Sequence, residues 1–171
     1  MPIAASFLPE FDHENAATRR LLERVPQAHL EWKPHAKSAT LAWLAGHLAQ
    51  VPTWLAAALD QDVFDVEPGG RPYVPPPLPT TTGEILARFD EHAAAGRAKL
   101  AAASDERMLG TWTMQKNGRT MFAMPRVAVV RSFILNHAIH HRGQLTVYLR
   151  LLDVPLPSLY GPTADEAMQV G

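Results

Sequence analysis

The stretch of sequence that decides the fold is residues 136–145, NHAIHHRGQL. Apolar residues on both sides of it recur at steps of three and four positions, which is the spacing of one face of an α-helix. His137 and His141 continue this series at positions where a bundle helix would direct leucine to the core. The series comprises Val127, Val130, Ile134, His137, His141, Leu145, Tyr148 and Leu152. Two imidazoles on a core-facing stripe require a chemical reason.

A third histidine, His47, lies in a separate apolar run with helical spacing. An antiparallel pairing of the two helices would bring it opposite His137 and His141, and three imidazoles can chelate a divalent metal ion. Ala138 follows His137, so the glutamate base of an H-E-x-x-H zinc protease is missing. The alternative is that the histidines are partly buried side chains that hydrogen-bond to backbone or carboxylate groups.

Four segments carry the period of an α-helix, and proline or glycine separates them. The sequence predicts helices at about residues 10–25, 38–59, 82–103 and 125–152. Ser38 or Thr40 would cap the second helix, and Thr81 or its neighbour would cap the third. Pro52 interrupts the second segment, which predicts either a kink beyond His47 or the end of one helix and the start of another.

Strand signals are almost absent from the chain. Residues 111–119 predict at most a short extended piece with a turn. Residues 60–80 hold two glycines and six prolines, which predicts an extended loop that could shape the entrance to a site. The 171 residues suffice for one core, so the economical architecture is an all-α four-helix bundle with long connections, forming a single domain over residues 1–171.

Composition excludes several classes of function. The chain has a net charge of −1 and no block of like charges, so it lacks the basic surface of a nucleic-acid binder. It contains no cysteine, which excludes disulfides, thiolate ligands and a cysteine nucleophile. Its first residues show neither the basic region nor the long apolar segment of a signal peptide, and no later run approaches the roughly 20 apolar residues that span a bilayer. We therefore expect a cytoplasmic protein with neither nucleic acid nor a membrane as its partner.

Three features in a fixed order resemble the DinB/YfiT-like superfamily. They are the histidine in LAGHL at residues 44–48, the stretch at residues 136–145, and the ending VPLPSLYGPTADE at residues 154–166. The resemblance spans nearly the whole chain. It implies a four-helix bundle that binds a divalent metal ion, usually nickel or zinc, through three histidines. By position these metal ligands would be His47, His137 and His141.

The same resemblance implies a range of activities. Members with assigned activities include thiol S-transferases that use bacillithiol or mycothiol, a mycothiol-dependent maleylpyruvate isomerase and candidate hydrolases. The family is distinct from the similarly named DNA polymerase, in agreement with the neutral charge. A homodimer and a low-molecular-weight thiol as co-substrate are expectations that come from the family alone. Fold and metal site follow from the resemblance more closely than the substrate does.

Other side chains on the last helix are candidates for the site. Gln144 and Tyr148 follow the histidine pair on the same face and would either orient a substrate or make packing contacts. His140 points about 100° away, which predicts a place behind the ligands, at an interface or on the surface. Gly143 predicts the close approach of a neighbouring helix or a bulky side chain. Arg142 predicts either a pair with a carboxylate of another helix or of a dimer partner, or a solvated guanidinium.

Two further groups lie on other helices. Large side chains around His47 would either wall a site or belong to the core, and a polar triplet on the third helix predicts a solvated face, with a carboxylate behind the site as the alternative. The first group is Trp43, Gln50 and Trp54, and the second is Asp90, Glu91 and His92.

Two functions of different classes remain. The first is a metal-dependent enzyme, a transferase or hydrolase that acts on a small molecule and in which no residue stands out as a general base. Its metal would either lower the pKa of a bound water or ionise a thiol. The second is a non-catalytic, metal- or ligand-binding dimeric bundle that serves as an interaction or stress-response module. Metal-dependent turnover separates the two.

Overall fold

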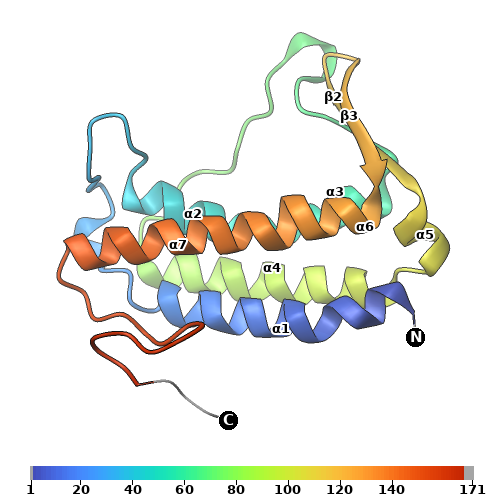
Figure 1. Cartoon of the computed structure of the whole chain (residues 1–171). Helices are drawn as coiled ribbons and strands as arrows, with labels where there is room; N and C mark the ends of the chain where they lie inside the picture. Colours follow the sequence, from blue (N-terminus) through green and yellow to red (C-terminus); the bar gives the residue numbers. More distant parts are fainter. Residues whose placement is uncertain (1, 168–171) are drawn as a thin grey trace.

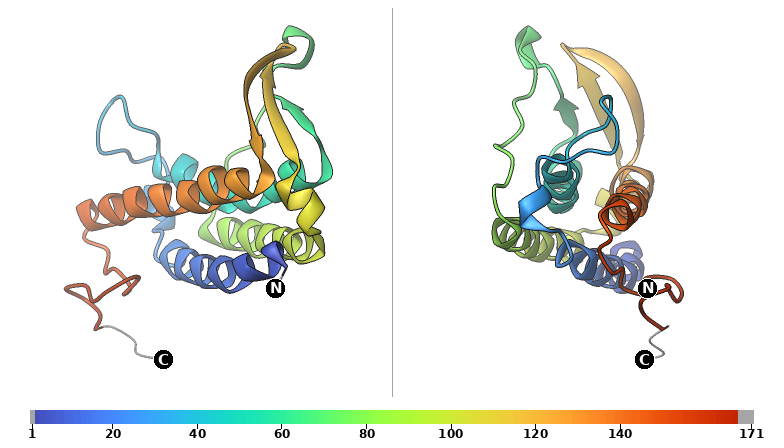
Figure 2. Two further views of the ribbon diagram at one scale, coloured as in Figure 1. Left: turned by 45° about the vertical axis from the view of Figure 1, so that its right-hand side comes forward. Right: turned by 90° about the vertical axis from the view of Figure 1, so that its left-hand side faces the viewer.

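A computed structural model describes residues 2–167 of the chain (Figure 1). Four helical rods form the framework: α1 packs against α4, α4 against α2, α2 against α7, and α7 against α1 (Figure 2). The α-helices are α1 (Ile3–Leu22), α2 (Leu41–Gln50), α3 (Trp54–Asp60), α4 (Thr82–Ala102), α5 (Asp105–Leu109), α6 (Arg126–Val129) and α7 (Asn136–Leu151). Short 3-10 turns are η1 (Gln27–His29), η2 (Val51–Thr53) and η3 (Pro68–Gly70). Among the described residues, no helix combines the length and apolar character needed to cross a membrane.

Two of the predicted helix starts carry the expected caps. The Thr40 hydroxyl accepts a hydrogen bond from the Trp43 amide at 3.2 Å, and the Thr81 hydroxyl accepts one from the Glu84 amide at 3.0 Å. Pro52 has no N–H to donate to the helical ladder, and the chain passes through η2 before α3 begins. The second predicted segment is therefore two helices joined by a tight turn.

The first helix extends further than predicted, because α1 begins at Ile3 and runs through Pro9. A proline inside a helix costs about 3 kcal/mol. The core-facing Phe7 and Phe11, on either side of Pro9, are 8% and 3% exposed. Burial of a phenylalanine side chain contributes about 1.5–3 kcal/mol. The two phenylalanines therefore offset the cost of the proline, and the helix continues.

The last rod matches the helix predicted at residues 125–152, with one difference in its hydrogen bonding. Between α6 and α7 lies η4 (Val130–Leu135), a π-helical segment in which each amide bonds five positions back instead of four. It ends two residues before His137. A π turn holds one residue more than an α turn and rotates the preceding part of the rod relative to the following part. η4 thus sets the angle between α6 and the histidines of α7.

A small sheet stands at one end of the bundle, so the all-α prediction is wrong (Figure 1). β1 (Val63–Asp65) pairs in parallel with β2 (Thr111–Lys116), which pairs antiparallel with β3 (Arg119–Pro125). Asn117 and Gly118 join β2 to β3 with φ angles of 49° and 75°, and Asn-Gly is the favoured pair for such a two-residue turn. β1 falls inside the predicted loop at residues 60–80, ahead of its first proline, Pro68.

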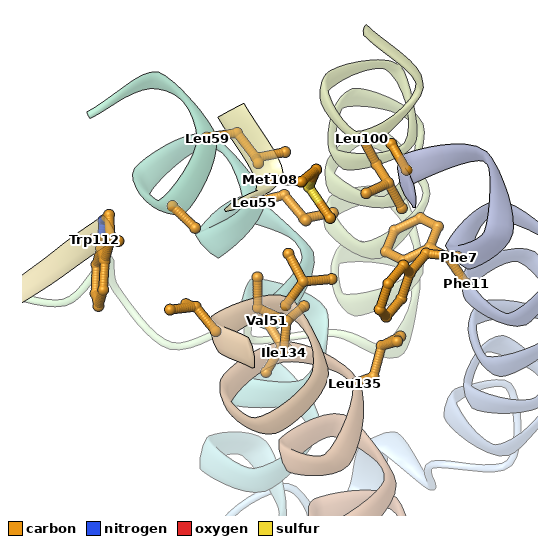
Figure 3. Close-up of a cluster of buried hydrophobic side chains, with 14 residues drawn as sticks. Phe7, Phe11, Val51, Leu55, Leu59, Leu100, Met108, Trp112, Ile134 and Leu135 are labelled. Carbon is orange, nitrogen blue, oxygen red and sulfur yellow. The ribbon is translucent and has the colours of Figure 1, made fainter. Parts of the chain in front are cut away.

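Two clusters of buried apolar side chains fill the bundle. The cluster nearer the sheet gathers residues of α1, α3, α4 and η4, and the other gathers residues of α1, α2, α4 and α7. In Figure 3, Phe7 and Phe11 lie on one side of the first cluster, and Trp112 of β2 stands on the other. The Trp112 indole nitrogen donates a hydrogen bond to the Ala57 carbonyl at 3.0 Å. This bond fixes the sheet to α3.

The chain after α7 runs back to α1 without forming a helix in the described residues. The Arg20 guanidinium donates a hydrogen bond to the Ser158 carbonyl at 2.9 Å and pairs with Glu166. The Tyr160 hydroxyl donates to the carboxylate of Glu14. Its oxygen lies 2.8 Å from Oε1 and 2.7 Å from Oε2 of that carboxylate. The predicted domain extends over residues 1–171, of which Met1 and residues 168–171 lie outside the described part.

Arg142 is buried and pairs with a carboxylate of another helix, as one of its alternatives predicted. Its Nη2 atom lies 2.6 Å from Glu14 Oε2 without hydrogen-bond geometry, so this contact is mainly ionic. Its Nη1 donates to the Glu14 carbonyl at 3.0 Å, and its guanidinium lies 4.9 Å from the centroid of the Tyr160 ring. The pair joins α7 to α1, and the tail covers it.

Gly143 does not mark a close approach, so that prediction is wrong. It is exposed on α7, and a Cβ atom built there meets nothing within 4 Å. At Gly96, by contrast, a Cβ would lie 2.8 Å from the Pro52 carbonyl oxygen, because α4 passes close to η2. Of these two helical glycines, only Gly96 is required by packing.

We therefore expect Gly143→Ala to raise the free energy of unfolding by about 0.5–1 kcal/mol, because alanine restricts the unfolded chain and suits the helix interior. Urea denaturation measures the change. Gly96→Ala is the matched control and should destabilise the protein. A loss of stability in Gly143→Ala would contradict the open surroundings of this position.

Candidate metal centre

Three histidines converge between α2 and α7. His47 stands one turn before the end of α2, and His137 and His141 lie one turn apart on α7. Each offers one ring nitrogen, and the three atoms all lie within 4.8 Å of one another. The Nε2 atoms of His47 and His137 are 2.8 Å apart. The structure thus brings together the three side chains that the sequence singled out, while metal binding stays a prediction.

The donor set fits a divalent ion. Metal–nitrogen bonds of about 2.0–2.1 Å place the nitrogens of a tetrahedral or octahedral shell about 2.9–3.4 Å apart. The 2.8 Å contact of His47 with His137 is slightly shorter than that range, and the ligand nitrogen of His141 lies within 4.8 Å of both. Two facing Nε2 atoms cannot both present a lone pair without a hydrogen or a cation to bind them, and a metal ion bound to both would meet this need. Three protein ligands leave at least one position open.

Burial keeps the three imidazoles neutral at neutral pH. It is the main reason that the pKa of His47 falls to about 4, and the nearby His141 and His137 lower it further. Burial also lowers the pKa of His137 to about 4, helped by His141 and His140. Burial lowers the pKa of His141 as well, against a hydrogen bond to Gln144 that raises it. Neutral imidazole is the form that binds metal ions.

These pKa values predict how the metal-free protein responds to acid. An unfolded histidine takes up a proton near pH 6.5, whereas folded His47 and His137 take one up only near pH 4. The unfolded chain binds more protons between these values, so stability should fall as the pH is lowered from about 6.5 to about 4. Urea midpoints in the presence of EDTA measure this decline, and His47→Asn should reduce it. A urea midpoint that does not change between pH 6.5 and pH 4 would contradict the lowered pKa values of His47 and His137.

Two indoles wall the centre, as one of the alternatives predicted. Trp43 stacks on the His47 ring with centroids 4.8 Å apart and an interplanar angle of 10°. Trp54 lies 4.8 Å from the ring of His137 and 5.6 Å from that of His47. Trp43 is 40% exposed and therefore not a core residue. The Gln50 amide donates to the Thr53 hydroxyl at 3.0 Å instead of meeting a histidine.

The candidates Gln144 and Tyr148 have different positions. Gln144 Oε1 lies 2.7 Å from His141 Nδ1, where it accepts a hydrogen bond and leaves Nε2 free for a ligand. Gln144 thus orients a histidine ring in the structure. The Tyr148 hydroxyl donates to the Ala39 carbonyl at 3.2 Å, and its ring packs against the second apolar cluster, as expected of a core tyrosine. His140 is exposed and lies outside the group of three converging histidines, as its surface and interface alternatives both predict.

The polar triplet on α4 stays outside the histidine cluster. Asp90 pairs with Arg19 of α1 at 2.7 Å, and Glu91 is exposed. His92 Nδ1 lies 2.8 Å from the Ala49 carbonyl oxygen and connects α4 to α2. The predicted solvated face is confirmed for the two carboxylates, and no carboxylate of the triplet supports the metal site.

A cavity of about 460 Å³ opens beside His47. Its walls come from the α2–α3 rod, η4, the sheet and residues 73–76 of the proline-rich segment, which agrees with the predicted role of that segment at an entrance. The sheet residues Phe64, Trp112 and Met114 were not among the predicted site residues. The Asn-Gly turn was the available signal, since this dipeptide between two extended runs predicts a hairpin.

The fold and the centre together define a mostly helical protein with a three-histidine site and an adjoining cavity. This chain belongs to the DinB family, whose sequence profile matches residues 1–169. A curated relative, described as uncharacterized protein YrdA of Bacillus subtilis (strain 168), is 26% identical over 169 residues, which cover 96% of this chain and 92% of that protein.

Two solved structures share the fold. A DinB-like protein from Bacillus cereus ATCC 10987 superposes with a TM-score of 0.69 at 21% identity and covers 90% of this chain and 95% of its own. The DinB-like protein YjoA from Bacillus subtilis gives a TM-score of 0.66 at 18% identity, covering 86% of this chain and 92% of its own. At these identities the likeness shows the fold alone.

Proposed function

We propose that this protein is a metal-dependent enzyme of the thiol S-transferase or hydrolase type that acts on a small molecule. The observation that carries the proposal is the convergence of three histidine ring nitrogens within 4.8 Å at the edge of a cavity of about 460 Å³. A closed structural site has no adjoining space for a substrate, whereas three ligands beside a cavity suit catalysis.

The side chains of the centre have separate roles in this proposal. His47, His137 and His141 would hold the ion, and Gln144 holds the His141 ring in the tautomer that presents Nε2. When bound, a divalent ion supplies a Lewis acid that lowers the pKa of a thiol or water at its open position. Trp54 covers one side of the centre, with its ring 5.6 Å from that of His47 and 4.8 Å from that of His137.

The finer parts of the proposal come from the family resemblance. Nickel or zinc is the proposed metal, since imidazole ligands accept both ions. A low-molecular-weight thiol is the proposed co-substrate of the transferase type. A homodimer in the cytoplasm is the proposed state of the protein.

The experiment compares turnover in metal-loaded and chelated protein. Untagged protein is loaded with Ni²⁺ or Zn²⁺ and assayed with low-molecular-weight thiols and a panel of electrophiles and esters. We expect a rate that falls at least about tenfold when the metal is removed and that returns when it is added back. Absence of a metal-dependent rate across the panel would refute the enzyme.

A second function is supported by one specific observation. Among the described residues, the cavity lining contains no carboxylate, lysine or cysteine that could serve as a general base or nucleophile. This favours a bundle that binds a metal ion and a ligand without turnover and acts as an interaction or stress-response module. Stoichiometric metal without any metal-dependent rate in the same assays would support it.

A further inference from the structure

We infer that the cavity beside His47 binds a neutral, mainly apolar molecule with one or two aromatic rings. The inference deepens the proposed function and rests on it in one respect, that this molecule is the substrate. Of the three histidines only His47 lines the cavity, at its edge. The inference concerns the rest of the cavity wall, which other residues form.

The first argument is the absence of charge in the described lining. No aspartate, glutamate, lysine or arginine lines the cavity. Away from the edge at His47, where the proposed metal ion would attract an anion, a carboxylate or phosphate would lose its hydration without gaining an ionic partner, which costs several kcal/mol. The wall beyond His47 therefore selects against anionic groups.

The second argument is that most polar groups of the wall are already paired. The Gln50 amide donates to the Thr53 hydroxyl at 3.0 Å, and that hydroxyl donates to the Gln50 carbonyl at 2.8 Å. The Trp112 indole nitrogen donates to the Ala57 carbonyl at 3.0 Å. These groups need no hydrogen-bond partner from a ligand. His47, at the edge of the cavity, belongs to the three-histidine cluster, and the reacting group of a substrate would lie there.

The third argument is the aromatic character and size of the space. Indole, phenyl and phenol rings from five segments face it, namely those of Trp54, Phe64, Tyr73, Trp112 and Phe133. The Phe133 ring is itself supported by Phe122, stacked at 4.8 Å with an interplanar angle of 14°. Aromatic walls favour aromatic ligands through offset and edge-to-face contacts. About 460 Å³ falls within the range of roughly 300–1,000 Å³ that is typical of small-molecule sites.

The test uses two dyes that differ mainly by one charged group. N-phenyl-1-naphthylamine is neutral and aromatic, and 8-anilinonaphthalene-1-sulfonate carries a sulfonate on the same skeleton. We expect the neutral dye to bind metal-loaded protein at one site per chain and at least about tenfold more tightly than the sulfonate. Energy transfer from tryptophan to the dye locates the site, because Trp54 and Trp112 line the cavity.

Two substitutions place the dye in the cavity. Ala57→Leu fills space in the lining and should weaken the neutral dye at least about tenfold, while the metal content stays unchanged. Ala94→Leu, at an exposed position of α4 outside the lining, is the matched control and should bind as the wild type does. Met114→Lys adds a cation to the wall and should reverse the preference in favour of the sulfonate. It tests the site even if Ala57→Leu does not fold.

Opposite outcomes separate this inference from the proposed function. Equal binding of the two dyes by wild type, or neutral-dye binding that is unaffected by both Ala57→Leu and Met114→Lys, would overturn the inference, whatever the metal content and turnover. A protein without metal or turnover that still shows the expected dye selectivity would refute the proposed enzyme and leave the apolar cavity as a ligand site.

Discussion

Alanine at position 137 is expected to remove the metal ion from the protein. His137→Ala leaves two imidazoles where three converge, and we expect the affinity for Ni²⁺ or Zn²⁺ to fall at least about 100-fold, beyond the 10–100-fold loss typical of a residue that only orients a ligand. Plasma mass spectrometry on untagged protein should show about one ion per chain in wild type and almost none in the variant. Quenching of Trp43 and Trp54 by Ni²⁺ gives a second readout.

The matched control lies on the same helix. His140→Ala removes an exposed imidazole outside the convergent group, and the metal content should remain that of wild type. His47→Ala and His141→Ala should lose the ion as His137→Ala does. If all three variants retained full metal content, the ion would be bound elsewhere and the three-histidine centre would be wrong.

Arg142→Met is expected to destabilise the protein by about 3–5 kcal/mol, because it leaves the carboxylate of Glu14 buried without its cation. Arg142 and Glu14 have side-chain exposures of only 2% and 9%, so water cannot replace the lost partner. The free energy of unfolding from urea titration measures the effect. The far-ultraviolet circular dichroism of the native state should remain helical.

A second substitution tests whether the loss comes from the stranded charge. Glu14→Gln combined with Arg142→Met should recover most of the stability, since a neutral amide can still accept the hydrogen bond of the Tyr160 hydroxyl. Arg19→Met breaks the exposed pair with Asp90 and should cost no more than about 1 kcal/mol. A loss at Arg142 as small as that at Arg19 would show that the buried pair contributes little to stability.

The helices could be predicted because each buries one periodic stripe. The apolar spacing around His137 located the last rod, and Thr40 and Thr81 marked two helix starts by their side-chain oxygens. The sheet could not be found this way, since its strands are of three to seven residues and take their order from pairing between distant segments. The predicted first helix begins too late, at about residue 10 instead of Ile3, because only the tertiary burial of its neighbours offsets the cost of Pro9 inside a helix.

The same distinction between local patterns and contacts of distant segments holds for the candidate site. The three histidines stood out because polar residues occupied core positions of two helices, a signal that lies in each helix separately. The Asn-Gly turn is a local signal for the hairpin, but the hairpin and the loop meet only in the folded chain, so the place of Trp112 and Met114 in the cavity wall could not be predicted from it. The prediction for Gly143 was wrong because a glycine occurs in a helix either where a neighbour comes close or where the position is open. The sequence does not distinguish these two cases.

The π-helical segment η4 sets the rotation of α6 relative to α7 about the axis of the last rod. It separates the histidines of α7 from the strand β3 that leads into α6. Removal of one residue from η4 would restore an ordinary α turn and swing the upstream part by about 100° about this axis. The hairpin wall would turn with it, while the spacing of His137 and His141 would not change. Loss of a single codon in η4 would therefore reshape the cavity wall without changing the relative positions of His137 and His141 on α7.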